Sequence, residues 1–221
     1  MTPHQASDSL RELAELAPII PVIVVKDIDH ARPLAEALVA GGLPALEVTL
    51  RTPVALEAIR IMSQVEGAVV GAGTVLTPND VERAHAAGAT FAVSPGSTPT
   101  LLQACEAEGL PILPGAATPS EVMANLERGY ELQKFFPAEA AGGVPMLKSI
   151  GGPLPQVSFC PTGGVSVKNV TQYLALPNVI CCGGSWVAPE AMMAAGDWDG
   201  IARLAAEALA IARGESVAEP A

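Results

Sequence analysis

The chain is poor in positive charge and in aromatic residues, and it has no long uninterrupted hydrophobic run. Its 12 Lys and Arg residues stand against 23 Asp and Glu residues, giving a net charge of −11. Because nucleic-acid binding needs clustered positive charge, we expect no nucleic-acid partner and no attachment to an anionic membrane. No apolar stretch reaches the roughly 18 residues of a membrane span. We therefore expect a soluble, cytoplasmic protein.

Metal-binding patterns are also missing. The four cysteines (Cys105, Cys160, Cys181 and Cys182) form no CxxC pair, and the three histidines are scattered along the chain. Zinc sites bring such ligands together at short and regular spacing. The sequence predicts reduced, buried cysteines, no metal and no cofactor. The first 17 residues are typical of a short amphipathic helix, because no apolar run follows a basic start as in a signal peptide.

Eight short apolar runs alternate with helix-like segments along the chain. Near-continuous apolar strands that alternate with helices predict a parallel sheet covered by helices. In 221 residues, eight such units favour a closed (β/α)8 TIM barrel over an open doubly wound sheet, since no GxGxxG follows the first run. We expect a single domain over 1–221, with a helix at 1–17 and a loose tail at 214–221. The eight runs lie at 18–25, 44–50, 68–73, 90–94, 110–115, 132–136, 156–160 and 178–182.

Thr-Pro pairs recur at 52–53, 77–78, 98–99 and 118–119. A threonine N-cap accepts from the first free N–H groups of a helix, and proline suits the first helical position. Each pair therefore predicts the start of a helix, and Thr118 with Glu121 forms a capping box.

The run at 44–50 carries polar residues where a buried strand is usually apolar. Glu47, Thr49 and Arg51 alternate, and the period of two places them on one face of a strand. A structural ion pair is one interpretation. A functional carboxylate and guanidinium inside the barrel is the other, because buried ion pairs often fail to stabilise a fold.

Glycine-rich turns follow several of the predicted strands, at the end of a barrel where active sites lie. Thr74 follows GAG, and Pro95 begins the turn of SPG. The last two strands are followed by PTGGVS and GGSW. Loops at these two places commonly bind phosphate through backbone N–H groups, so they predict a phosphate site, although they could also be turns without a ligand. The residues concerned are Thr162, Gly163, Gly164, Gly184 and Ser185.

Lys134 is one of only four lysines, and it lies inside the apolar run LQKFF. Free lysine has a pKa of about 10.4, so its amine is almost fully protonated at neutral pH. The apolar neighbours Phe136 and Pro137, with Arg51 across the barrel, are expected to lower that pKa by desolvation and like charge. A neutral amine can attack a carbonyl to form a Schiff base. A lysine paired with Glu47 to plug the barrel is the alternative.

In order, the motifs PVIVV, LEVTLRT, GAGTVL, SPG, KFFPAE, PTGGVS and GGSW resemble those of the 2-keto-3-deoxy-6-phosphogluconate (KDPG) aldolase family over nearly the whole chain. The resemblance implies a class I aldolase on a (β/α)8 barrel, with Lys134 as the Schiff-base lysine and Glu47 as the general acid/base. It implies that Arg51 and Thr74 bind the carboxylate of pyruvate and that Pro95 and Phe136 line the pocket. Thr162, Gly163, Gly164 and Ser185 would hold the phosphate.

The resemblance further implies a cytoplasmic homotrimer of the Entner–Doudoroff pathway, with a phosphorylated sugar acid and pyruvate as ligands and with side activity on 4-hydroxy-2-oxoglutarate. The galactonate-series aldolase, a phosphosugar isomerase or epimerase, and a non-catalytic phosphosugar-binding protein are the alternatives. The chain departs from the family pattern at Ser97 and at GAATPSE (115–121), where we expect an effect on substrate preference.

Overall fold

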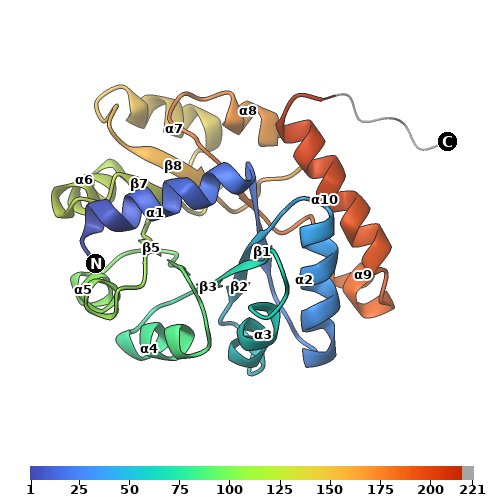
Figure 1. The fold of residues 1–221 in the computed structure, drawn as a ribbon. Coiled ribbons are helices and arrows are strands. Elements are labelled where there is room, and N and C mark those ends of the chain that lie inside the picture. Colours follow the sequence, from blue (N-terminus) through green and yellow to red (C-terminus); the bar gives the residue numbers. More distant parts are fainter. Residues whose placement is uncertain (216–221) are drawn as a thin grey trace.

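The computed structural model describes residues 1–215, so the tail predicted at 214–221 lies outside the described residues from position 216 onward. All paired strands are parallel and form two sheets, a six-stranded one in the order β5-β4-β3-β2-β1-β9 and a three-stranded one in the order β6-β7-β8. Helices cover the outside of the curved sheets (Figure 1). The strands are β1 (Ile19–Ile23), β2 (Ala45–Thr49), β3 (Val69–Gly73), β4 (Ala92–Val93), β5 (Ile112–Leu113), β6 (Gly115–Ala116), β7 (Leu132–Phe135), β8 (Ser158–Pro161) and β9 (Cys182–Gly184).

The helices lie between the strands, as the alternation of patterns predicts. The α-helices are α1 (Pro3–Leu16), α2 (Ala31–Ala40), α3 (Ala55–Met62), α4 (Pro78–Ala86), α5 (Pro99–Glu108), α6 (Pro119–Arg128), α7 (Gly143–Gly151), α8 (Val170–Leu174), α9 (Glu190–Ala195) and α10 (Trp198–Ala212). A short 3-10 helix, η1, spans Ile28–His30.

Three of the four Thr-Pro pairs begin helices as predicted. Thr77, Thr98 and Thr118 are the N-caps of α4, α5 and α6, each followed by proline, and the capping box at Thr118 is present. The prediction for the pair at 52–53 is wrong. The Thr52 hydroxyl donates to the carbonyl of Val25 instead (2.6 Å), and α3 begins only at residue 55.

The prediction of one closed eight-stranded barrel sheet is corrected by the structure. The run predicted at 110–115 is split at Pro114 into β5, which pairs with β4, and β6, which pairs with β7. Between β8 and β9 there are isolated bridges, at Phe159 with Val179 and at Thr162 with Gly183. Both interruptions contain a proline, Pro114 or Pro161, and proline has no N–H to donate to a neighbouring strand. What the structure has is a parallel α/β fold with a six-stranded and a three-stranded sheet.

Helix α1 lies across the N-terminal ends of β7 and β8 (Figure 1). Ser7 accepts a hydrogen bond from the backbone N–H of Glu131 (3.1 Å), and Arg11 donates to the hydroxyl of Ser158 (3.1 Å). Leu10 of α1 belongs to an inner apolar cluster that several strands share. The other side of the strands packs against the remaining helices in a larger core. This arrangement leaves the opposite, C-terminal ends of the strands open.

Between residues 1 and 215 there is no helix long and apolar enough to cross a membrane.

Candidate active site

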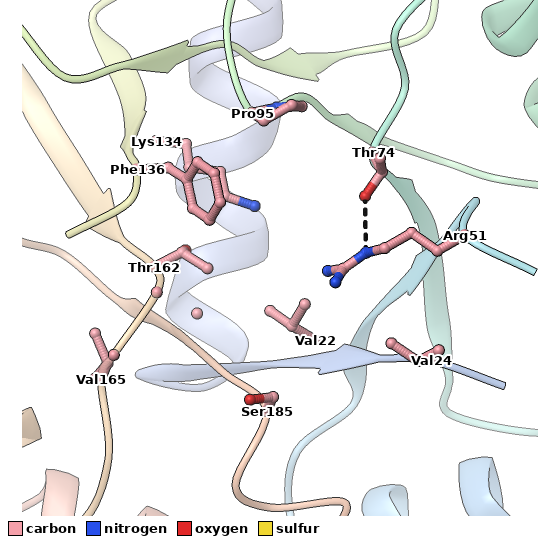
Figure 2. A pocket seen from close by; sticks show the side chains of 13 residues that line it. Val22, Val24, Arg51, Thr74, Pro95, Lys134, Phe136, Thr162, Val165 and Ser185 are labelled. Carbon is pink, nitrogen blue, oxygen red and sulfur yellow. Dashed lines mark hydrogen bonds between the residues drawn. The ribbon is translucent and has the colours of Figure 1, made fainter. Parts of the chain in front are cut away.

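A cavity of about 530 Å³ opens at the C-terminal ends of the strands. Figure 2 shows its wall, to which both sheets contribute, with the side chains of Lys134 and Arg51 pointing toward one another from opposite sides. The lining residues are Val22, Val24, Arg51, Thr74, Pro95, Lys134, Phe136, Thr162, Gly163, Gly164, Val165, Gly183 and Ser185.

Lys134 is 5% exposed and comes from β7, where every residue is buried. Its Nζ lies 3.2 Å from Oε1 of Glu47, which is 3% exposed, and 5.4 Å from the centroid of the Phe136 ring. A buried ammonium–carboxylate pair is costly to desolvate, and its attraction offsets that cost only when the geometry is good. The carboxylate is positioned to take a proton from the amine, which would leave a nucleophile facing the cavity.

Glu47 does not itself belong to the wall of the large cavity. It lies behind Lys134 and lines a small interior cavity of about 10 Å³, together with Leu10 and Leu13 of α1. Its side chain packs on Gly73 of β3, where a Cβ atom would collide with Oε1. The glycine that ends the third strand therefore makes room for the carboxylate. The two interpretations of Lys134, plug and nucleophile, are compatible in this geometry, because the paired lysine also reaches the cavity.

Arg51 and Thr74 form one side of the cavity. Arg51 Nε donates to Thr74 Oγ1 (3.3 Å), as the dashed line in Figure 2 marks. Arg51 lies beyond the end of β2 and is exposed, so it reaches the cavity from the following turn and not from the strand face. Thr74 has φ 58°, a left-handed conformation that is rare for a β-branched residue and costs about 1–3 kcal/mol. Such strain is typical of functional sites.

The opposite side of the cavity is formed by the loops after β8 and β9. Thr162 is 6% exposed, and within residues 1–215 its Oγ1 has no hydrogen-bond partner although the atom is buried. Buried hydroxyls are nearly always paired, so an unpaired one is unusual. Its oxygen lies against Gly183, where a Cβ atom would collide with it. Gly163, Gly164 and Ser185 lie in the wall as expected from sequence. From the paired glycines at 183–184, Gly183 lines the cavity, and Gly184 lies against the Trp186 ring instead.

Pro95 and Phe136 line the cavity, whereas the two departures from the family pattern do not appear in its wall. The Ser97 hydroxyl donates to Oδ1 of Asn125 (2.7 Å), a residue that is 1% exposed. In GAATPSE, the first two residues form β6 and the rest begins α6. Any effect of these residues on substrate preference would therefore be indirect, because they do not line the cavity.

Sequence reasoning missed Val22, Val24, Val165 and Gly183 in the cavity wall. The motif PVIVV does carry the signal, because alternate residues of a strand share one face. In the described part of the chain, no three His, Cys, Asp or Glu residues are grouped as metal ligands.

All four cysteines lie among the described residues, where each is buried, as predicted, and none is in a disulfide. Burial raises the pKa of Cys105 to about 12, with Glu106 contributing further, so this thiol stays protonated.

The chain is similar to known proteins over most of its length. The family model "Aldolase: KDPG and KHG aldolase" matches residues 10–204. The chain belongs to the KDPG and KHG aldolase family.

Several members of this family are similar to the chain over almost their full length. The chain is 51% identical to the 2-dehydro-3-deoxy-phosphogluconate aldolase of Pseudoalteromonas atlantica, over 93% of this chain and 96% of that protein. It is 49% identical to the KDPG aldolase of Zymomonas mobilis, solved with 3-phosphoglycerate, with a TM-score of 0.88 over 93% and 97% of the two chains. It is 50% identical to the KDPG aldolase of Legionella pneumophila, solved with pyruvate captured as a covalent carbinolamine intermediate, with a TM-score of 0.87 over 89% and 96%.

Proposed function

We propose that this member of the KDPG and KHG aldolase family is a class I aldolase that cleaves 2-dehydro-3-deoxy-6-phosphogluconate to pyruvate and glyceraldehyde 3-phosphate. The observation that carries the proposal is the position of the buried Lys134. Its side chain lines the cavity opposite Arg51, and its Nζ lies 3.2 Å from Oε1 of Glu47. The covalent carbinolamine that the Legionella pneumophila relative forms with pyruvate supports the same chemistry here.

The reaction begins with proton transfer from Lys134 to Glu47, which frees the amine to add to the C2 ketone of the substrate. Glu47 returns this proton to the carbinolamine hydroxyl, which leaves as water and gives a protonated imine, the electron sink of the reaction. Because Glu47 lies behind Lys134, we propose that it takes the C4 hydroxyl proton through one water molecule as the C3–C4 bond breaks. Glyceraldehyde 3-phosphate leaves, Glu47 returns the proton to C3 of the resulting enamine, and hydrolysis of the imine releases pyruvate.

The two ends of the cavity suit the two ends of this substrate. Arg51 can bind the carboxylate next to C2 through two parallel hydrogen bonds, a geometry that lysine cannot provide. The Arg51–Thr74 contact of 3.3 Å holds the guanidinium in place. The unpaired Thr162 hydroxyl, the backbone N–H groups of Gly163 and Gly164, and Ser185 would bind the phosphate.

Further properties are part of the proposal. Residues 1–221 would form one domain, in which β5 and β6 act as one interrupted strand and the bridges between β8 and β9 close a (β/α)8 barrel. The homotrimer, the cytoplasmic location, the Entner–Doudoroff pathway and side activity on 4-hydroxy-2-oxoglutarate stay predictions. Sedimentation velocity measures the oligomeric state directly.

Borohydride trapping tests the proposal. Sodium borohydride added with pyruvate should reduce the imine to a stable secondary amine, and peptide mass spectrometry should find that adduct on Lys134. Lys134→Met should abolish both trapping and cleavage, whereas Lys148→Met, at an exposed position of α7, should change neither. An adduct on another lysine, or cleavage by Lys134→Met, contradicts the mechanism.

The same experiment separates the rival functions. A phosphosugar isomerase or epimerase would use the phosphate-binding loops without an imine, and a non-catalytic binding protein would bind without turnover. Within the family, assays of pyruvate release from the gluconate-derived, galactonate-derived and 4-hydroxy-2-oxoglutarate substrates, run side by side, determine the preference at C4.

A further inference from the structure

The loop that follows Lys134 is joined by its backbone to the loop that follows β8. Ala138 N donates to the carbonyl of Thr162 (2.8 Å), and Glu139 N donates to the carbonyl of Gly163 (3.0 Å). The strand that carries the nucleophile thus continues directly into a segment that holds the proposed phosphate loop. Glu139 belongs to the motif KFFPAE, yet the proposed mechanism gives it no role.

A third carbonyl of the loop after β8, that of Gly164, accepts a hydrogen bond from Nδ2 of Asn169, the residue that precedes α8 (3.1 Å). In a trans peptide, the C=O group and the N–H of the next residue point in opposite directions. With three successive carbonyls bonded outward, the N–H groups of Gly163, Gly164 and Val165 point away from those partners. All three residues lie in the cavity wall. Successive backbone N–H groups at such a wall can together bind an anion.

Side-chain contacts secure the same loop. Gly164 has φ 81°, and a Cβ atom at this position would lie 2.5 Å from Cγ of Glu139, so the Glu139 side chain packs directly on the loop. The Tyr173 hydroxyl donates to Oε1 of Glu139. Tyr173 is 0% exposed on α8, and burial, followed by the hydrogen bond to Glu139, raises its pKa. The hydroxyl therefore keeps its proton and stays a donor at any physiological pH.

We propose that Glu139 and Tyr173 are positioning residues for the phosphate end of the substrate, which hold the loop at 162–165 so that its N–H groups face the cavity. This inference rests on the proposed function and deepens it. Neither side chain belongs to the cavity wall, so both act through Gly164. The role of Glu139 is that of a hydrogen-bond acceptor and a packing surface, which a neutral glutamine of the same shape can also provide.

The test compares two reactions of the same full-length enzyme. Cleavage of the phosphorylated substrate needs the loop. Exchange of the pyruvate methyl protons with deuterium, followed by NMR, needs imine and enamine formation at Lys134 but no phosphate. The ratio of kcat/KM for cleavage to the exchange rate therefore isolates the phosphate-binding contribution from any general effect on the fold.

We expect Tyr173→Phe and Glu139→Ala to lower this ratio by about 3- to 10-fold, mainly through KM, as the loss of one hydrogen bond implies. Glu139→Gln keeps an acceptor for Tyr173 and should change the ratio less than about two-fold. Tyr130→Phe is the matched control: Tyr130 is 1% exposed and its hydroxyl donates to Glu106 (3.1 Å), outside the cavity wall. It should leave the ratio unchanged.

If Tyr173→Phe leaves the ratio unchanged, whether or not both reactions become slower, the inference is overturned. It is also overturned if Tyr130→Phe lowers the ratio as much as Tyr173→Phe does. These results differ from a failure of the proposed function, in which the unmodified enzyme would neither cleave the substrate nor exchange the pyruvate protons.

Discussion

Thr162→Val should make the free protein more stable while it makes the enzyme slower. The Thr162 hydroxyl is buried, and among the described residues it finds no hydrogen-bond partner. An unpaired buried hydroxyl costs about 1–3 kcal/mol, and valine replaces it with a methyl group of similar shape. We expect a gain of about 1–2 kcal/mol in the free energy of unfolding. In a chain of 221 residues, each kcal/mol shifts Tm by about 2–4 °C.

The matched control is Thr49→Val, which makes the same change of atoms at a satisfied position. Thr49 is 0% exposed and its hydroxyl donates to the carbonyl of Ile23 (2.8 Å). Its removal should cost about 1–2 kcal/mol, so the two variants should shift Tm in opposite directions.

Thermal unfolding in phosphate-free buffer measures the stability, because a bound anion would stabilise the native state by mass action. Pyruvate release measures the activity. If the Thr162 hydroxyl binds the substrate, its loss should lower kcat/KM by about 5- to 150-fold, equivalent to about 1–3 kcal/mol. A Tm that falls in Thr162→Val as it does in Thr49→Val would refute the reasoning, and so would full activity.

Other changes have equally definite expected outcomes. Gly164→Ala should lower both Tm and the affinity for the phosphorylated substrate, because φ is 81° and the new Cβ would collide with Glu139; calorimetry and steady-state kinetics measure the two effects. Glu106 has a pKa below its ordinary value of 4.5, chiefly through its hydrogen bonds from Arg128. Its stabilisation should thus be fully present above about pH 4.5 and be lost as the pH falls through the lower folded value. The acid-induced loss of unfolding free energy should therefore be smaller in Glu106→Gln, where the carboxyl group of Glu121, whose pKa is also lowered, still contributes. Asn125→Ala should cost about 1–3 kcal/mol in urea unfolding, because it leaves buried polar partners unpaired. EDTA should leave pyruvate release unchanged, since the imine and not a metal accepts the electrons.

Local features of the fold could be predicted from the sequence because they depend on neighbouring residues. A helix N-cap needs partners within three residues, so Thr77, Thr98 and Thr118 act as their motifs predict. Thr52 has the same motif, but its hydroxyl donates a hydrogen bond to the carbonyl of Val25, 27 positions earlier in the chain, and does not cap a helix. The break at Pro114 also has a local cause, the missing N–H, and the sequence reasoning could have included it.

For the site, the sequence by itself determined which residue types were available and the strand ends at which they stand. A lysine inside an apolar strand and glycine pairs after two strands are visible without any coordinates. Only the tertiary structure decided that Glu47 lies behind Lys134, 87 positions away in the chain, and not in the cavity wall. It likewise decided that Gly183 and not Gly184 lines the cavity. The physical reason is that the register between distant strands and the packing of side chains against each other depend on the whole fold, whereas sequence periodicity specifies only which face of its own strand a residue occupies.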